Sequence, residues 1–309
     1  MKNIEDIKAF YEARLLPELK ALEEKRLKTL NKVILAGVFI GIPAAAFSFY
    51  MRHAMPLIFG AVIFLVAMKY LSSDYVFDFK SAVIEKIVNF VDSNLKYSKT
   101  GYIPRGDFLL SSIFRQYPDR YSGDDLVSGK IGDTAVRFSE LHAEYVTRDS
   151  KGRTQYHTIF KGLFFIADFN KKFNGLTVVL PDVAERLFGH VGAMLQSCKK
   201  GRGELVKLED PEFERLFVVY GTDQIEARYI LSTSLMERIV DFQKKHNRRL
   251  YISFIGNKIF MAVSYARDLF EPRLFRTILD FEPIRMYFED LYLAAGIVED
   301  LNLNLRIWT

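Results

Sequence analysis

The stretch Val33–Tyr50 reads VILAGVFIGIPAAAFSFY and contains no charged residue. A second apolar stretch, PLIFGAVIFLVAMKYL, covers Pro56–Leu71, and Lys69 is its one charged residue. A helix needs about 20 apolar residues to cross a bilayer. Only Met51–Met55 separates the two stretches, so the two helices must be antiparallel neighbours. The sequence therefore predicts a transmembrane helical hairpin over residues 33–71.

Two alternatives compete with this interpretation. A cleaved secretory signal fits less well, because the mostly polar segment 1–32 precedes the first stretch and no small-residue cleavage site follows it. The other alternative is a hairpin buried in the core of a soluble protein, but core helices are rarely uncharged on every face over such a length.

Basic residues flank the hairpin on one side only, and the connecting loop holds Arg52 alone. The flanking residues are Lys20, Lys25, Arg26, Lys28 and Lys32 before the hairpin, and Lys69, Lys80 and Lys86 after it. The positive-inside rule then places both termini in the cytoplasm.

The composition excludes several classes of protein. The chain has 309 residues, of which 50% are hydrophobic and 26% charged, which is unlike a disordered chain. Lys and Arg number 43 against 38 Asp and Glu, and this excess of +5 is spread along the chain instead of forming a nucleic-acid footprint. Cys198 is the one cysteine, which excludes a disulfide framework and a cysteine-rich metal site. We expect no metal, no cofactor and no nucleic-acid partner.

Four segments are predicted along the chain. Residues 1–32 form a cytoplasmic helical segment with a break at Pro17, and residues 33–71 form the hairpin. Residues 72–98 form a juxtamembrane amphipathic helix capped at Ser73 and Asp74, and residues 99–309 form a cytosolic α+β domain. The apolar stripe of the juxtamembrane helix comprises Ile84, Ile87, Val88, Val91 and Leu95.

The cytosolic domain begins with strand patterns. Stretches at 126–131, 134–146, 155–169 and 177–180 are separated by turn residues and predict an antiparallel meander. Later strands are expected at 204–208, 217–220, 250–255 and 258–263. Helices are expected at 181–197, from Asp210, at 235–246, and over most of 270–298 with an interruption at Pro283. The fold class is therefore α+β, a sheet with packed helices.

A candidate polar cluster comprises Asp168, Asp210, Asp223, Glu226 and Arg228. Asp168 ends an apolar strand, where a carboxyl group can have a raised pKa or can accept backbone hydrogen bonds. Asp223 and Glu226 have the spacing of a helix capping box, and Ser234 with Glu237 repeats that spacing. We favour capping over acid–base chemistry or metal binding for these residues.

Two basic loops are candidates for contact with anionic lipid. Their residues are Lys199, Lys200, Arg202, Lys244, Lys245, Arg248 and Arg249. The alternative is a solvated surface, or a helix C-terminus that attracts basic residues through its dipole.

Gly37, Gly41 and Ala45 recur at four-residue intervals in the first apolar stretch. Small residues allow close approach of helices in lipid, where no hydrophobic force drives association. The stripe packs either on a second copy of the chain or on the second helix of its own hairpin, near Gly60 and Ala61. In both cases we expect Gly41→Leu to disrupt packing.

Five segments together resemble the bacterial family known as domain of unknown function 3137, whose members are sometimes mislabelled galanin. They are Ser122–Gly129, Phe160–Phe169, Leu208–Phe213, Val219–Arg228 and Asn302–Trp308. The resemblance covers most of the chain and implies two membrane helices and a cytosolic domain. It also implies the bacterial inner membrane as location and LemA-type membrane proteins as partners, and it implies no reaction.

No catalytic site is assigned, because the sequence contains no nucleophile–base pair or paired carboxylates at a defensible spacing. This favours an oligomeric, membrane-anchored scaffold or interaction protein over an enzyme. The alternative is a membrane-bound enzyme or a ligand or lipid sensor that uses Asp168 or the Asp223–Arg228 region.

Overall fold

The computed structural model describes residues 4–168, 172–182, 202–301 and 303. The described chain has the predicted α+β fold: long N-terminal helices precede an antiparallel sheet of nine strands with packed helices. Two compact units can be distinguished. Unit 1 comprises residues 1–90 and 270–289, and unit 2 comprises residues 91–269 and 290–309.

Unit 1 begins with one uninterrupted helical stretch. It consists of α1 (Ile4–Phe10), the π-helical segment η1 (Tyr11–Leu15) and α2 (Leu16–Met51). Pro17 lies in the first turn of α2, where its missing N–H costs nothing. The predicted break at Pro17 is therefore wrong, and the irregularity is a single π-helical segment just before it.

The return helix is also longer than predicted. It consists of α3 (Met55–Phe79), the π-helical segment η2 (Lys80–Ile84) and α4 (Glu85–Val91). No helix begins at Ser73, because its hydroxyl group donates to the Tyr70 carbonyl oxygen within α3, at 2.7 Å. Ile84, Ile87 and Val88 are buried as expected of the stripe, but Leu95 lies on a strand.

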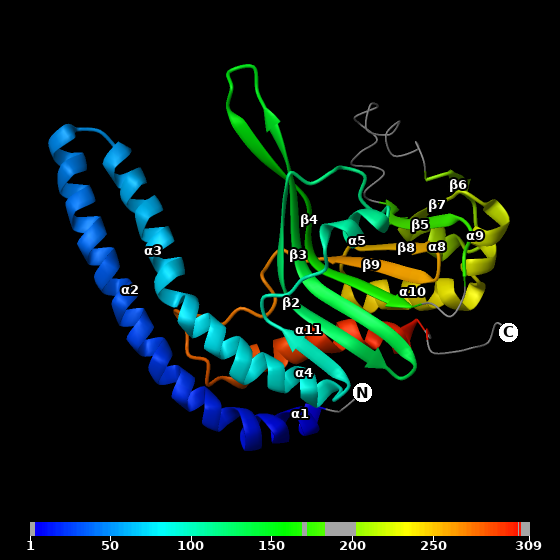
Figure 1. Ribbon diagram of the computed structural model, residues 1–309, viewed down its shortest axis with the longest axis horizontal. Coiled ribbons are helices and arrows are strands. Elements are labelled where there is room, and N and C mark those ends of the chain that lie inside the picture. Colours follow the sequence, from blue (N-terminus) through cyan, green and yellow to red (C-terminus); the bar gives the residue numbers. More distant parts are fainter. Residues whose placement is uncertain (1–3, 169–171, 183–201, 302, 304–309) are drawn as a thin grey trace. The chain divides into compact units, whose positions relative to one another are not determined.

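Figure 1 shows α2 and α3 as long antiparallel helices joined by a short turn. Arg52 makes this turn with a left-handed backbone, φ 50°. Both helices are long and apolar enough to cross a membrane by length and composition, and 6% and 0% of their apolar windows are buried. Phe39 is 76% exposed and Phe49 is 89% exposed. The interpretation of this hairpin as the core of a soluble protein is therefore wrong for this chain.

Unit 1 also contains a segment from near the C-terminal end of the sequence. Helix α11 (Phe281–Asp300) begins at Phe281, and Pro283 lies in its first turn instead of interrupting it. The helix predicted from residue 270 is absent before Phe281 in the described chain. We call residues 270–280 the strap.

Unit 2 contains the sheet, with strand order β1-β2-β3-β4-β9-β8-β5-β7-β6. The first four strands are β1 (Leu95–Ser98), β2 (Arg120–Ile131), β3 (Thr134–Arg148) and β4 (Thr154–Asp168). The others are β5 (Leu176–Pro181), β6 (Glu204–Val206), β7 (Phe217–Gly221), β8 (Leu250–Ile255) and β9 (Lys258–Ser264).

The predicted meander holds only for the strands up to β4. The hairpin of β8 and β9 lies between β4 and β5, and β9 pairs with β4 from Gly162↔Ser264 to Asp168↔Lys258. Local alternation of apolar residues identifies a strand but does not specify a distant partner, so this insertion could not be predicted from the pattern. The helix predicted at 181–197 lies almost wholly outside the described residues.

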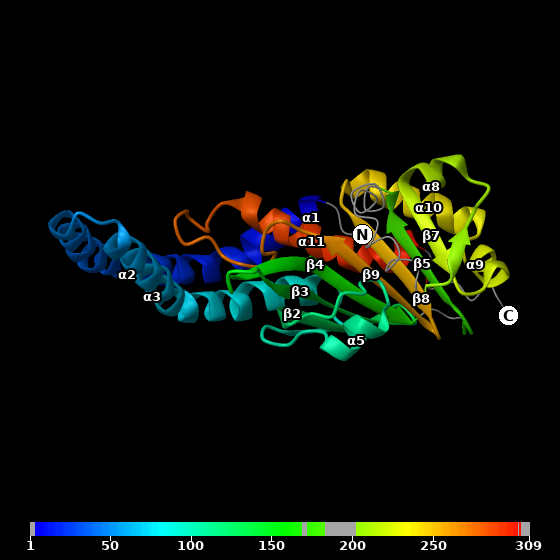
Figure 2. The same cartoon turned by 90° about the horizontal axis from the view of Figure 1, so that it is seen from above.

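Helices cover both faces of the sheet. Figure 2 shows α5 (Arg105–Leu110) against one face and α10 (Thr233–His246) against the other. Phe108 of α5 belongs to a buried cluster with Leu141 of β3 and Phe164 of β4. Two short helices, α8 (Pro211–Leu216) and α9 (Gln224–Ile230), flank β7 in the sequence.

Candidate functional site

Two carboxylates of the predicted polar cluster cap helices. Asp210 accepts the backbone N–H groups of Glu212 and Phe213 at 2.9 and 3.0 Å, at the start of α8. Asp223 accepts those of Ile225 and Glu226 at 2.8 and 2.9 Å, at the start of α9. These bonds satisfy helix N–H groups that have no partner within the helix.

Glu226 does not complete the predicted capping box. Its carboxylate accepts the backbone N–H groups of Asn174 and Gly175 at 2.9 and 2.7 Å, and so closes the turn that precedes β5. The prediction for the next helix is also off by two residues, because Ser232 and not Ser234 caps α10.

The remaining two residues of the cluster, Arg228 on α9 and Asp168 at the end of β4, have other partners. Arg228 donates to the Lys207 carbonyl oxygen at 3.3 Å. Asp168 pairs in register with Lys258 on β9, at the same end of the sheet as Asp223. Four strand spacings separate β4 from β7, about 19 Å, so these carboxylates do not converge on one substrate.

The basic residues predicted to face lipid are in part engaged within the protein. Arg202 is 4% exposed and donates to the carbonyl oxygens of Ser112 and Ile113, which contradicts its assignment to a lipid-facing surface. Lys199 and Lys200 lie outside the described residues. The later loop is partly paired: Lys244 binds Glu212 at 2.6 Å, Lys245 binds Asp300 at 3.3 Å, and Arg248 lies over the Tyr265 ring, while Arg249 is exposed.

Small residues make the close contacts inside the α2–α3 hairpin. A Cβ atom added to Gly60 would lie 2.7 Å from the Cβ atom of Ala44, and one added to Gly37 would lie 3.2 Å from the Phe64 ring. A Cβ atom added to Gly41 would meet nothing within 4 Å. Gly37 therefore packs inside the hairpin, whereas the backbone of Gly41 is not covered by the second helix. Within the described chain, a side chain at position 41 therefore meets no part of the hairpin, and disruption of packing by Gly41→Leu stays a prediction for contact with a second copy.

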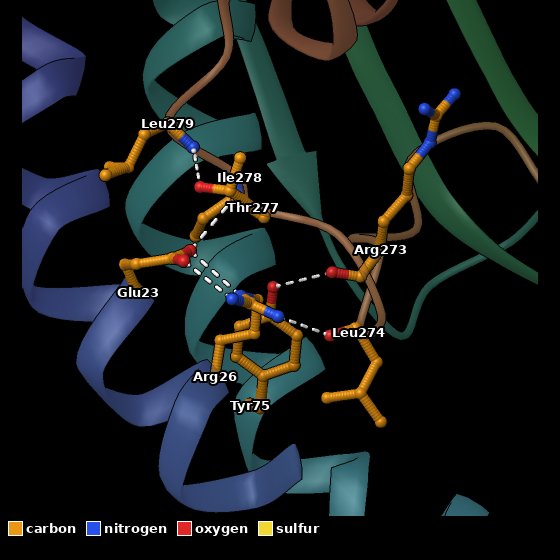
Figure 3. Close-up of polar contacts among 8 residues, drawn as sticks. All are labelled: Glu23, Arg26, Tyr75, Arg273, Leu274, Thr277, Ile278 and Leu279. Atoms are coloured by element: carbon orange, nitrogen blue, oxygen red, sulfur yellow. Dashed lines mark hydrogen bonds and ion pairs between the residues drawn. The ribbon is translucent and has the colours of Figure 1, made fainter.

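Sequence reasoning missed a buried polar network at the base of the hairpin, which Figure 3 shows. The Arg26 guanidinium binds Glu23 through two N–H···O bonds of 2.9 and 2.7 Å, and a third N–H group donates to the Leu274 carbonyl oxygen at 2.7 Å. The side chains of Arg26 and Glu23 are 6% and 14% exposed. Glu23 also accepts the Ile278 N–H group at 3.2 Å.

Further side chains of the hairpin helices bind the same segment. The Tyr75 hydroxyl donates to the Arg273 carbonyl oxygen at 3.4 Å, and the Tyr11 hydroxyl donates to the Leu279 carbonyl oxygen. Lys80, which is 4% exposed, pairs with Glu271 at 2.7 Å. The strap is thus held by five contacts along the helices. We call this set of contacts the clamp.

The electrostatics of the clamp follow from its bonds. Hydrogen bonding from Arg26 holds the pKa of the Glu23 carboxyl below its ordinary value, against the opposing effect of burial. The pair is therefore ionised at neutral pH. A bidentate ion pair and hydrogen bonds to backbone groups compensate for the loss of hydration on burial. This arrangement positions a loop; it does not present a reacting group. The i, i+3 spacing of Glu23 and Arg26 on α2 was the one signal available in the sequence.

Unit 2 contains a buried carboxyl group of a different kind. Glu140 on β3 is 7% exposed, and its Oε2 atom accepts the Leu269 N–H group at 2.8 Å. Burial raises the pKa of Glu140 to about 7; the hydrogen bond from Leu269 opposes this rise, and the neighbouring carboxylates of Asp124, Asp268 and Asp125 add to it. Glu140 therefore changes charge near neutral pH, and its hydrogen-bond partner Leu269 directly precedes the strap in the sequence.

The fold and the clamp define a class of protein: an α+β protein with an apolar two-helix hairpin whose base binds a segment from near the C-terminus. Residues 158–303 match the family described as a protein of unknown function, DUF3137, and this match supports membership of the chain in that family. The matched range begins in β4 and extends past the end of α11.

The chain also shows a distant similarity to a solved structure, the crystal structure of the mycobacterial trehalose monomycolate transport factor A, TtfA. The identity is 11% and the TM-score is 0.34. The similarity covers 68% of this chain and 95% of that chain. No curated protein matches the chain.

Proposed function

We propose that this protein is an integral protein of the bacterial inner membrane that acts as an oligomeric scaffold or interaction protein. The α2–α3 hairpin is the anchor, and both termini are cytoplasmic. The observation that carries the proposal is the outward-facing apolar surface of the hairpin. Side chains such as Ile42 and Val66 are 65% and 66% exposed, which a bilayer would cover at no hydrophobic cost.

An interaction role is supported by what the polar residues do. Asp210 and Asp223 cap helices, and Glu226 closes a turn, so the residues on which an enzyme or sensor would rely already have structural partners. The open backbone at Gly41 supports contact with a second copy in the membrane. Membrane lipid is the first partner that this role requires. LemA-type membrane proteins are the partner that the family resemblance suggests.

Topology is tested by cysteine labelling in intact cells. Cys198→Ser provides a cysteine-free background, because the chain has one cysteine. A cysteine at His53, in the turn, should react with an impermeant thiol reagent. Cysteines at Asn3 and Ser150 should react only after the cells are opened. The reverse pattern would overturn the orientation, and labelling of all three sites in intact cells would overturn the hairpin anchor.

The interaction role is tested by isolating the full chain from membranes in a gentle detergent and measuring the mass of the complex. We expect a mass above that of one chain, with either further copies or a second membrane protein present. A monomer of 35.8 kDa plus detergent, with no second protein, would contradict the scaffold role and leave the anchor untouched.

A further inference from the structure

The strap is a loop whose apex lies at its membrane-facing end. Glu271 binds Lys80, Arg273 binds Tyr75, Leu274 binds Arg26, Ile278 binds Glu23 and Leu279 binds Tyr11. The helices are antiparallel, and Lys69 on α3 lies at about the level of Val33 on α2, as the contact of Lys25 with Asp78 implies.

The helix rise of about 1.5 Å per residue converts these contacts into levels. Tyr75 lies about 9 Å and Arg26 about 10 Å below the start of the apolar stretches, whereas Lys80 and Glu23 lie about 15–17 Å below it and Tyr11 about 33 Å. The chain therefore climbs to Leu274 and descends again after it.

The apex comprises Leu274, Phe275 and Arg276. Phe275 is 66% exposed, and Arg276 is exposed as well. In Figure 3 the Leu274 side chain points in the direction in which α2 runs from Glu23 to Arg26, which is toward the apolar stretch. The Arg273 side chain points the opposite way. An apolar and a basic side chain are thus held about 10 Å below the start of the apolar stretches.

The charge around this level is positive. Lys28, Lys32 and Lys69 are exposed. Neither these three residues nor Arg276 pairs with a carboxylate among the described residues. Asp74 is the acidic residue nearest to this level, and its backbone carbonyl oxygen accepts from Lys25. A polar headgroup layer adds about 5–7 Å to each side of the hydrocarbon, so the apex side chains come within reach of it.

We propose that the strap apex, Leu274–Arg276, is a membrane-contacting element that inserts Phe275 at the headgroup level of an anionic lipid surface and binds lipid phosphate through Arg276. The proposal rests on the proposed membrane anchor and adds to it a contact that is distant in sequence from the hairpin. The clamp gives this element its position, because Tyr75 and Arg26 bind the carbonyl oxygens of two successive residues, Arg273 and Leu274.

Water and a protein partner are the alternatives to lipid. Exposure to water leaves the apolar surface of Phe275 uncovered, although five side chains of the helices hold the strap in this position. A second protein would need to reach a site that the anchor itself brings next to the bilayer. Aromatic and basic side chains at this depth are typical of lipid–water interfaces, and each basic residue there contributes to binding of anionic lipid.

The test uses the full chain reconstituted in vesicles, with one tryptophan at a time. Trp308→Phe removes the single native tryptophan. Three variants then carry a probe: Phe275→Trp at the apex, Phe39→Trp in the apolar stretch and Ile4→Trp on α1, far below the membrane level. The vesicles contain phosphatidylethanolamine and phosphatidylglycerol with acyl chains brominated near the headgroup, which quench nearby tryptophan fluorescence.

We expect the tryptophan fluorescence of Phe39→Trp and of Phe275→Trp to be quenched, and that of Ile4→Trp to remain. Quenching at Phe39→Trp without quenching at Phe275→Trp would overturn the strap proposal and leave the anchor standing. Absence of quenching at Phe39→Trp would overturn both. Equal quenching at Ile4→Trp and Phe275→Trp would also overturn the strap proposal, because the contact would then not be specific to the apex.

The charge preference is tested with Arg276→Gln and its matched control Arg273→Gln, both in the Phe275→Trp background. Removing one basic residue near an anionic surface weakens binding about fivefold. We expect Arg276→Gln to reduce the quenching in phosphatidylglycerol vesicles and Arg273→Gln to leave it unchanged. Equal effects of the two variants, or equal quenching of the parent in pure phosphatidylcholine, would overturn the binding of anionic lipid.

Discussion

At the scale of single residues, unit 1 is organised by one buried ion pair. Arg26 binds Glu23 and the Leu274 carbonyl oxygen at once, so its removal leaves the Glu23 carboxylate without its ion-pair partner and that carbonyl oxygen without its donor. Breaking one partner of a buried pair is costly because the remaining charge has no water to solvate it.

Arg26→Ala should therefore lower the free energy of unfolding by about 2–4 kcal/mol. It should also speed tryptic cleavage in the strap, which offers Arg273 and Arg276 as cleavage sites. Arg14→Ala is the control, since Arg14 is exposed on the same continuous helical stretch. Thermal unfolding and limited proteolysis in detergent give the two readouts. Equal behaviour of the two variants would show that the clamp does not stabilise unit 1.

Glu140 predicts a dependence of stability on pH. Its pKa is about 7 in the folded protein, above the ordinary value of 4.5, so the folded protein binds the extra proton between these values. Stability is then fully present below about pH 4.5 and falls as the pH rises through 7, by about 3 kcal/mol in total.

Glu140→Gln should remove this slope, because glutamine can still accept the Leu269 N–H group but does not ionise. The measurement is the unfolding free energy of both proteins at several values between pH 5 and pH 8. The two curves should approach each other at low pH and separate as the pH rises. Parallel curves would contradict the assignment of the slope to Glu140.

At the scale of elements, the packing of α2 on α3 depends on which glycines face the partner helix. Gly60→Leu places atoms where Ala44 already lies, whereas Gly41→Leu extends into open space. The two changes gain the same helix propensity, so they form a matched pair.

Gly60→Leu should destabilise the hairpin by about 1–3 kcal/mol through overpacking, and Gly41→Leu should not. Thermal unfolding in detergent distinguishes them. A loss of the oligomer in Gly41→Leu at unchanged stability would place a contact between copies at Gly41. Equal destabilisation by the two variants would mean that the hairpin packs differently.

The elements also show where sequence patterns succeed. Apolar alternation identified β3, β4, β8 and β9, and the short polar side chains Asp210 and Asp223 were correctly read as caps, because a cap binds N–H groups two and three residues away. The prediction failed for Glu226, whose partners lie about fifty residues earlier, at Asn174 and Gly175. A local pattern contains no information about such a partner.

At the scale of the whole molecule, the proposed anchor predicts how the protein leaves the membrane. The chain should stay in the membrane pellet through high salt and alkaline carbonate and dissolve only in detergent, because a spanning hairpin is not held by charge. The control is the double variant Ile42→Asp with Ile63→Asp. Each of these charges costs about 3 kcal/mol in a bilayer, so this variant should be held less firmly than the parent chain. Extraction of the parent chain by carbonate would contradict a spanning anchor.

The sequence by itself determined the features that depend on near neighbours. The apolar stretches 33–50 and 56–71, the short turn between them and most strands of the sheet follow from residues a few positions apart. Side-chain periodicity and the energy of burying backbone groups act over that range.

Only the tertiary structure decided which distant segments meet. The insertion of β8 and β9 beside β4, the binding of the strap by Arg26 and Glu23, and the open backbone at Gly41 each join or separate residues far apart in the sequence. These contacts depend on how whole elements pack together. The same residue types would satisfy many other partners, so no local pattern can select among them.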